Sequence, residues 1–328
     1  MALFKTIDEL ALFVPIMKSF DFNLVSPDIE RAEGRWIIPM LSQAMYDELF
    51  AAYDANTLSD DQEELLAKVR KPLAQLAFFL YAPKGNVNVS SSGIQQTHSD
   101  NAKPAFQWSV DQMMQSYLDG GYEDLDNLQA YLDAHKDDFE TWATSTAYTE
   151  SKELFLNTPK EFSTHFNINT SRRTFLAMRH ILKRHNDDTI KALLGDDLYD
   201  EIKEQVIDED ISVNNNELLA NYIRPALVHL TMADALTELS IQINEFGITV
   251  ISSFNAVNMP TSQSRNPASS SIISDLYKKE KKLAEQTLDK LREYLEANAD
   301  DYPLYTVVDT SATPTAFEND STSGIAFI

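Results

Sequence analysis

The sequence predicts a mainly helical protein made of two tandem copies of one helical unit, each with a small β-hairpin, followed by an extended C-terminal arm. The block Tyr46–Glu48 recurs as Tyr199–Glu201, a spacing of 153 residues (199 − 46 = 153). At the same spacing the block Glu64–Ala67 recurs as Glu217–Ala220. Two identical blocks in one register indicate an internal duplication, which decides how the rest of the chain is divided.

The duplication divides the chain into unit one, residues 1–145, unit two, residues 153–306, and an arm, residues 307–328. Near the ends of the units the matching pairs Tyr131-Leu132 and Tyr294-Leu295 lie 163 residues apart (294 − 131 = 163). The additional residues therefore fall earlier in unit two. We expect them in Ser252–Ser270, a stretch rich in Ser, Asn and Pro, because loops tolerate insertions.

Unit one opens with two helix starts. Thr6, followed three residues later by Glu9, predicts a capping box at a short helix. Ser26 followed by Pro27 predicts the N-cap and the first turn of a second helix. Pro39 has no backbone N–H and therefore predicts an interruption of that second helix.

Apolar spacing predicts the later helices of unit one. Met45, Leu49 and Tyr53 recur every four residues and form an apolar stripe. The Gly120-Gly121 pair predicts a break between the last two helices. The helices expected in this part of the chain cover Ser42–Tyr53, Asp60–Tyr81, Trp108–Leu118 and Tyr122–Asp137.

Two short stretches, Val87–Ser90 and Ile241–Asn244, alternate between β-branched and polar residues, a pattern typical of strands. We expect hairpins over Val87–Gln95 and Ile241–Ile251. An isolated two-stranded hairpin is marginally stable, so we expect both to project and to contact neighbouring subunits or a central channel. The candidate contact residues are Ile94 and Ile248.

Unit two repeats the order of unit one. Leu154–Phe166 echoes Leu3–Val14 at the start of the unit. The helices expected after it cover Ser171–His185, Asp187–Leu194, Asp196–Val206, Glu217–Leu239 and Ser271–Asn298. The fourth of these repeats the most apolar helix of unit one and should be the buried centre of its unit.

The composition restricts the classes of function. The formal net charge is −24 and the sequence pI is near 4.5, a balance that repels nucleic acid and anionic membranes on average. The chain has no cysteine, which excludes disulfides and thiolate chemistry. We find no secretory signal pattern and no apolar run near the roughly 20 residues needed to span a bilayer. We therefore expect no contact with membranes.

No arrangement of residues typical of catalysis or cofactor binding occurs in the sequence. The eight glycines lack the spacing of a phosphate-binding loop. His180 and His185 are five residues apart, so they do not share a helix face as a helical metal pair requires. A stretch beginning at Asp208 opens like a calcium loop but holds Val213 and Leu219 where that loop needs Gly and Glu. We expect no catalytic residue, no metal and no cofactor, and hence no enzyme.

The repeated tyrosines, Tyr46 and Tyr199, are each followed by Asp and Glu. A Tyr-Asp-Glu triplet could serve catalysis, but its recurrence in both units favours packing. We expect the tyrosine ring to close the helix end while the two acids face water.

One predicted helix, Ser171–His185, goes against the acidic composition. Arg172, Arg179 and Lys183 share one of its faces. These cations either pair with the protein's own acids or form a docking surface for an acidic partner or for DNA phosphates. A second basic stretch, Lys278–Lys282, fits an exposed helix face.

The arm, Val307–Ile328, is too polar to bury enough surface to fold by itself. Its tip carries Ile325, Phe327 and Ile328, and the first two point to the same side of an extended strand. This pattern suits strand addition or pocket insertion on a neighbouring protein, although an ordinary frayed terminus is the alternative. Deleting Gly324–Ile328 distinguishes the two, because only the first role would weaken assembly at an unchanged melting temperature.

In Ile37–Leu49 a turn rich in Ile and Met leads to Tyr-Asp-Glu-Leu, and in Leu65–Leu80 a long apolar helix carries a proline near its middle. These stretches resemble the small helical head–tail connector, or adaptor, proteins of tailed bacteriophages. The block Tyr294–Pro303 is similar to the terminal block of an uncharacterised family of phage and prophage structural proteins from Bacteroidetes. The likeness covers most of Leu3–Tyr305.

The resemblance implies a virion structural protein of the neck, made in the cytoplasm of a bacterial host. It implies a cyclic homo-oligomer, a dodecamer, next to the portal, with the portal and neighbouring neck or tail proteins as partners. DNA would pass through this ring without sequence-specific binding. Two other functions stay open: a helical-repeat scaffold or peptide-binding protein of a bacterial host, and an enzyme of unknown class.

Overall fold

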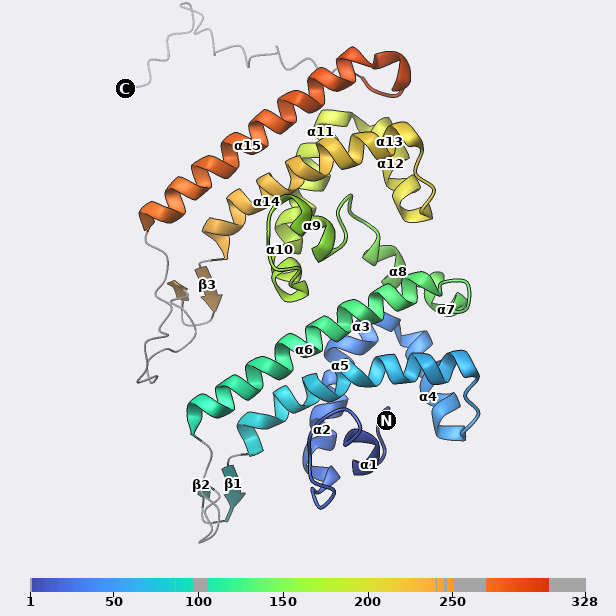
Figure 1. Ribbon diagram of the computed structural model, residues 1–328, viewed down its shortest axis with the longest axis vertical. Helices are drawn as coiled ribbons and strands as arrows, with labels where there is room; N and C mark the ends of the chain where they lie inside the picture. Colours follow the sequence, from blue (N-terminus) through green and yellow to red (C-terminus); the bar gives the residue numbers. More distant parts are fainter. Residues whose placement is uncertain are drawn as a thin grey trace, which may run out of the picture.

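We describe the chain from a computed structural model whose described residues are 2–85, 87–91, 93–96, 106–239, 241–244, 247–250 and 270–306. Figure 1 shows two helical units stacked along the longest axis of the molecule, unit one in blue to green and unit two in yellow-green to red. In unit one the long helices α5 (Asp60–Gly85) and α6 (Gln107–Ala134) run side by side. In unit two α14 (Arg224–Glu238) and α15 (Ser270–Ala297) do the same. Each unit is therefore organised around one long helix pair.

Short helices precede and follow the long pair of unit one. Those before it are α1 (Ile7–Leu10), α2 (Phe22–Ala32), the π-helical turn η1 (Glu33–Ile37), α3 (Ile38–Leu41) and α4 (Gln43–Ala55). Two more, α7 (Glu140–Ala143) and α8 (Thr146–Ser151), lead out of the unit.

Unit two follows the same order, except that the counterpart of α5 is divided into two helices and a π-helical turn, and that a single turn follows the long pair. Its elements are α9 (Pro159–His165), α10 (Arg172–Arg184), the π-helical turn η2 (His185–Ile190), α11 (Lys191–Leu194), α12 (Asp196–Asp208), α13 (Val213–Leu218), the π-helical turn η3 (Leu219–Ile223) and, beyond the long pair, a 3₁₀ turn at Ala299–Asp301. The predicted internal duplication is confirmed, down to the π-helical turn before the short third helix.

Each unit buries its own hydrophobic core. In unit one Ile37, Leu73 and Trp142 are fully buried, and in unit two Phe162 and Leu227 are. The two cores share no residue in the described part of the chain. Since apolar burial dominates folding, each unit carries its own main source of stability.

The predicted fold class is corrected: the units are all-helical, and in the residues described no sheet layer belongs to them. The strands β1 (Val87–Ser90) and β2 (Gly93–Gln96) form a two-stranded ladder after α5, and β3 (Ile241–Asn244) and β4 (Gly247–Val250) form another after α14. Each strand has four residues and pairs with one other strand. The alternating residues favour local pairing, but so short a ladder builds no packed layer of the fold.

The predicted helix break at Gly120-Gly121 is wrong, because α6 runs without interruption from Gln107 to Ala134. A Cβ atom on Gly120 would lie 2.2 Å from the Gln75 side chain, and one on Gly121 would lie 2.7 Å from that of Leu76. The two glycines are therefore needed for the close approach of α5 and α6, and helix propensity gives way to packing.

The predicted boundaries around Pro27 and Pro39 are also wrong. The helix α2 begins earlier, at Phe22, where Asp21 caps it by accepting a hydrogen bond from the Asn23 amide. Pro27 lies inside this helix, and Pro39 lies in the first turn of α3, where a missing N–H costs little. The chain reverses instead at Ser42, which has a φ of 74°.

Unit two shows similar shifts of predicted boundaries. The stretch expected as a separate helix from Asp187 continues α10 through the turn η2. The buried helix begins before Glu217, with Ser212 as its cap, and includes η3 just ahead of Pro225. The capping boxes at Thr6 and Thr158 are present. No helix in the described residues is long and apolar enough to cross a membrane.

Candidate functional site

A buried polar network fastens the start of unit one to its helices. The backbone N–H of Leu3 donates to the Glu33 carboxylate at 2.6 Å, and the Leu3 carbonyl accepts from Arg70 Nε at 2.8 Å. Arg70 also binds Glu9 at 2.8 Å. Glu9 in turn belongs to the capping box of α1. The network thus joins the N-terminal segment to η1 and α5.

Unit two repeats this arrangement. The backbone N–H of Phe155 donates to the Asn186 side chain at 3.1 Å, and its carbonyl accepts from Arg224 Nε at 2.9 Å. Arg224 lies 3.2 Å from Glu161, which belongs to the capping box of α9. We call these two networks the anchor networks; they comprise Leu3, Glu9, Glu33, Tyr46 and Arg70 in unit one and Phe155, Glu161, Asn186, Tyr199 and Arg224 in unit two.

The repeated tyrosines belong to the anchor networks. Tyr46 and Tyr199 are 4% and 2% exposed. Asn186 donates to the Tyr199 hydroxyl at 2.6 Å, and that hydroxyl donates to Asp187 at 2.8 Å. Burial raises the pKa of both tyrosines, with neighbouring carboxylates adding to the effect. They therefore stay protonated, which fits the packing role predicted from their recurrence.

One position distinguishes the two anchor networks. Glu33 in η1 is 2% exposed, and Asn186 in η2 is fully buried. Burial raises the pKa of the Glu33 carboxyl to about 7, while the hydrogen bonds from Leu3 and Tyr46 act in the opposite direction. Unit one thus holds a titratable group where unit two holds a neutral amide.

The structure places the cations of α10 against the protein's own acids. Arg172 binds Asp126 of α6 at 2.9 Å. Arg179 and Lys183 bind the Glu153 carboxylate at 2.7 and 2.8 Å. These pairs favour the first of the two interpretations of the basic helix, since a cation already paired is less available to an external anion.

Two histidines of unit two also lie against acids of the protein. His185 lies 2.9 Å from Asp234, and burial lowers the pKa of its imidazole. His229 lies 2.7 Å from Glu280, which is 1% exposed. Within the part of the chain that the structure describes, no group of three or more His, Asp or Glu side chains could hold a metal ion.

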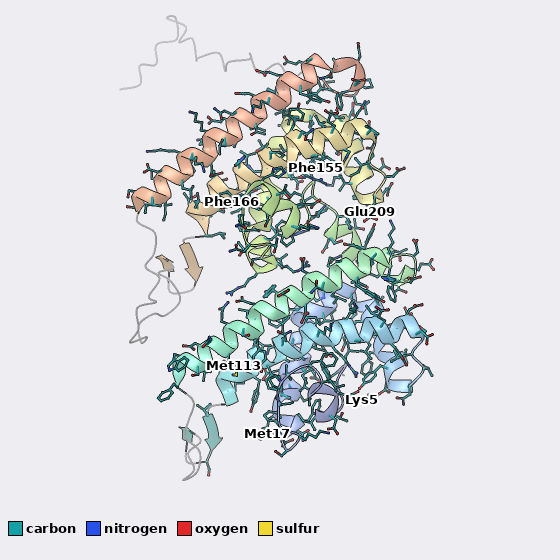
Figure 2. The ribbon with its side chains drawn as sticks, in the orientation of Figure 1. Lys5, Met17, Met113, Phe155, Phe166 and Glu209 are labelled. Atoms are coloured by element: carbon teal, nitrogen blue, oxygen red, sulfur yellow. The ribbon has the colours of Figure 1, made fainter. Side chains whose placement is uncertain are left out.

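The two units meet along a polar interface that we call the seam. Its central residue is Glu209, which binds Lys136 at 2.8 Å and Lys152 at 2.9 Å. Burial opposes the ionisation of Glu209, but the hydrogen bonds from both lysines outweigh it and lower the pKa of the carboxyl. Figure 2 shows Glu209 on the side of unit two that faces unit one.

Further contacts extend the seam to both sides. Lys152 also binds Asp133 of α6 at 3.0 Å, and the Tyr148 hydroxyl donates to the Ile207 carbonyl at 3.3 Å. Together with the pair between Arg172 and Asp126, these contacts place unit two on the outward face of α6. Sequence reasoning missed the seam, because none of its pairs lies within one helix.

The basic stretch of α15 is exposed, as its pattern predicts. The acid within this stretch, Glu280, points inward to His229, so the stretch differs from α10, whose cations are paired with acids. In the described residues Lys278, Lys281 and Lys282 form no ion pair, and Lys281 lies over the ring of Tyr277. Lys279 lies 3.6 Å from Glu280 and is 65% exposed. The outer face of α15 therefore presents cations on an acidic protein.

The other predicted contact residues lie outside what can be described. Ile94 and Ile248 are placed by their backbones, opposite Val89 and Ile243 in the two ladders, and their side chains lie outside the described residues. The arm with Ile325, Phe327 and Ile328 lies wholly outside the described residues, as does the loop Ser252–Ser269.

Comparison with known proteins agrees with the duplication. A family of unknown function, DUF6712, matches residues 37–152 and matches again residues 190–315. Each matched stretch covers most of one unit. No curated protein and no solved structure matches the chain.

Proposed function

We propose that this chain, which belongs to the family of unknown function DUF6712, is a virion structural protein of the head–tail connector type. In this proposal copies of the chain form a cyclic ring next to the portal of a tailed bacteriophage. DNA passes through the ring without sequence-specific binding. The protein then acts in assembly, and its partners are further copies of itself, the portal and neighbouring neck or tail proteins.

The observation that carries the proposal is the seam. Unit two is a second copy of unit one, and it binds unit one through ion pairs such as Lys136 with Glu209 and Arg172 with Asp126. A helical unit that already binds its own duplicate has the property from which rings and filaments are built.

The anchor networks support a structural role. Their buried ionisable groups hold backbone groups in place: Arg70 and Arg224 bind the carbonyls of Leu3 and Phe155. The tyrosines of the networks are kept protonated by burial. The buried side chains of the anchor networks thus fix the geometry of each unit. A ring of defined size requires units of fixed geometry.

The charge of the chain supports the passage of DNA. A net charge of −24 gives an average surface that repels phosphates, so a duplex would move past without being held. The cations that share one face of α10 are paired with Asp126 and Glu153, which reduces their attraction for DNA phosphates.

The proposal is tested by measuring the mass of the purified full chain by native mass spectrometry and light scattering, alone and with the portal protein encoded in the same genome. We expect a closed oligomer of one defined mass, or its formation on the portal. A chain that stays monomeric at all concentrations and has no affinity for the portal would contradict the proposal. Portal, capsid and terminase genes beside the gene of this chain would support it independently.

A further inference from the structure

His185, the first residue of η2, lies where α10 ends against α14. Its Nε2 atom lies 2.9 Å from a carboxylate oxygen of Asp234 on α14, and its Nδ1 atom lies 3.2 Å from the hydroxyl of Thr189 in η2. The His185 side chain is only 13% exposed. The imidazole therefore joins η2 and the end of α10 to α14, and these elements pack against one another (Figure 1). We call His185, Thr189 and Asp234 the latch.

The hydrogen-bond partners of the latch suit a neutral imidazole. A carboxylate only accepts, so Nε2 of His185 carries the proton and donates to Asp234. The Nδ1 atom then accepts from the hydroxyl of Thr189. Both ring nitrogens are thus hydrogen-bonded without a charge on the ring. A second proton would place a positive charge on a largely buried side chain, which burial disfavours.

The charged groups around His185 act on it in both directions. Asp234 also binds Arg184 at 2.7 Å, and Arg184 binds Glu238 at 2.6 Å. Burial lowers the pKa of the His185 imidazole, and it outweighs Asp234 and Glu238, which raise that pKa. The Arg184 guanidinium lowers the pKa further. Because Arg184 shares the Asp234 carboxylate, the attraction of this carboxylate for a charged ring is reduced.

Other titratable side chains on the elements packed around the latch are paired elsewhere or exposed. Asp188 of η2 is exposed. The pairs are His180 with Glu238, Asp187 with Lys183 and the Tyr199 hydroxyl, Lys191 with Asp196 and Asp200, Arg224 with Glu161, and His229 with Glu280. The protonation of His185 is therefore decided by burial and by its contacts in the latch and with Arg184 and Glu238.

Unit one has apolar residues at the positions that correspond to the latch. Ala32 lies 153 residues before His185 (185 − 153 = 32), and Leu80 lies 154 residues before Asp234 (234 − 154 = 80). These are the two spacings by which the anchor networks match. Ala32 is fully buried, and Leu80 packs against the core of unit one. The latch is thus a feature of unit two that the duplication did not fix.

We propose that the latch is sensitive to acid: neutral His185 fastens η2 and the last turn of α10 to α14, and protonation of His185 loosens them. The device needs no ligand, since the proton is the signal. It acts on one unit, because the corresponding contact of α2 with α5 is apolar. This inference goes beyond the proposed assembly function and does not depend on it.

The direction follows from linkage. A histidine with a lowered folded pKa contributes stability that is complete above 6.5 and is lost as the pH falls below that value. Glu33 of unit one has a raised pKa, so its contribution changes in the opposite direction. Acidification from about pH 7.5 to about pH 5.5 should therefore loosen unit two at the latch without loosening unit one around Glu33.

The first test is an NMR titration of the histidine rings in the full chain, with His185→Gln to assign the signal of His185. We expect a midpoint below 6.5 for this ring. Asp234→Asn should lower the midpoint further, because it removes a carboxylate that favours the protonated ring. A midpoint at or above 6.5 in the unchanged chain, or one that does not fall in Asp234→Asn, would overturn the inference.

The second test is amide hydrogen exchange of the full chain at the two pH values, corrected for the intrinsic effect of pH on exchange. Peptides from residues 176–194 should lose protection at the lower pH in the unchanged chain. They should keep it in His185→Gln, whose amide donates to Asp234 and accepts from Thr189 without a charge. Peptides from residues 23–41 of unit one should show no such loss.

His180→Gln is the matched control, because His180 is on the same helix, is 62% exposed and lies 3.7 Å from Glu238. It should lose protection at the lower pH as the unchanged chain does. The inference is overturned if the unchanged chain keeps its protection, or if His185→Gln loses protection equally. If His185→Gln does not fold, the ring titrations of the unchanged chain and of Asp234→Asn decide, with the signal assigned through its proximity to Thr189.

Discussion

Glu33 and Asn186 occupy the same position in the two units and accept the same hydrogen bond. Glu33 accepts from the backbone N–H of Leu3 at 2.6 Å, and Asn186 accepts from that of Phe155 at 3.1 Å. The amide does this without charge, whereas the carboxylate must be desolvated when it ionises. Ionisation at this position therefore makes the stability of unit one depend on pH, and unit two has no such dependence at this position.

Replacing Glu33 by Gln should stabilise the protein above neutral pH. The folded pKa is raised from 4.5 to about 7, so the folded state binds the proton more tightly and stability falls as pH rises through this range. At about 1.4 kcal/mol per pKa unit, the gain in Glu33→Gln approaches about 3 kcal/mol above pH 7 and vanishes below pH 4.5. Urea unfolding from pH 4 to pH 8 measures it.

The control for this prediction is Glu63→Gln, a carboxylate on α5 that is exposed and forms no ion pair in the described residues. It should not reproduce the gain in stability above neutral pH that Glu33→Gln gives. A Glu33→Gln variant with the same pH profile as the unchanged chain would show that Glu33 does not titrate in this range.

Adding one methyl group to a helix should have opposite effects at two glycines. Gly121→Ala places a Cβ 2.7 Å from the Leu76 side chain in the packed contact of α5 and α6, so we expect a loss of about 1–3 kcal/mol. Gly34→Ala meets no atom within 4 Å and should gain up to about 1 kcal/mol from helix propensity. Thermal unfolding of both variants measures the difference, and a stabilised Gly121→Ala would show that the helices separate easily.

The reversal after the third helix of each unit offers another matched pair. Ser42 and Gly195 have the same backbone, with φ of 74° and 79° and ψ of 156° and 162°. This region is essentially restricted to glycine, and other residues there cost about 1–3 kcal/mol. Gly195→Ala should therefore destabilise the protein by about this amount, with a further contact of 2.9 Å to Thr306.

Ser42→Gly should relieve the same strain in unit one. The gain is reduced by the loss of the Ser42 cap, which accepts from the Met45 amide at 3.4 Å and is therefore weak. We expect a net gain of about 1 kcal/mol in chemical unfolding. A loss of stability in Ser42→Gly would mean that the cap outweighs the backbone strain.

Removing the charge of Glu209 should weaken the seam. Glu209→Gln loses the charge-assisted contacts to Lys136 and Lys152, and because the carboxylate is 34% exposed we expect a loss of no more than about 1 kcal/mol. The pKa of Glu209 is lowered, so this contribution is present above the usual pKa and is lost as pH falls through the lowered one. Salt dependence at pH 7 checks it, with Glu204→Gln as control.

The sequence predicts the repeated helices well, because each rests on local signals. The capping boxes at Thr6 and Thr158 and the apolar stripe of Met45 and Leu49 act within one or two turns. Boundaries fail where long-range packing decides. In the sequence Gly120 and Gly121 indicate a helix break. In the structure they leave space for the side chains of Gln75 and Leu76 on α5.

The residues of the anchor networks could have been found by extending the repeat. Arg70 and Arg224 lie 154 residues apart (224 − 70 = 154), close to the spacing of the identical blocks. The pair Glu33 and Asn186 is not identical and gives no such signal. The seam could not have been found, because the pairing of Glu209 with Lys136 depends on the relative placement of two units.

Fusion of the two units in one chain has a consequence for any assembly built from them. The contact at the seam is intramolecular and holds at any protein concentration, whereas a contact between copies obeys mass action. Every second contact between neighbouring units of the assembly would then be intramolecular and would persist at any protein concentration. Unit one and unit two also become different positions with different neighbours, so each can change separately, as Glu33 and Asn186 have. In an assembly of such chains, unit one and unit two alternate. The rotational symmetry of the assembly is set by the number of chains and not by the number of units.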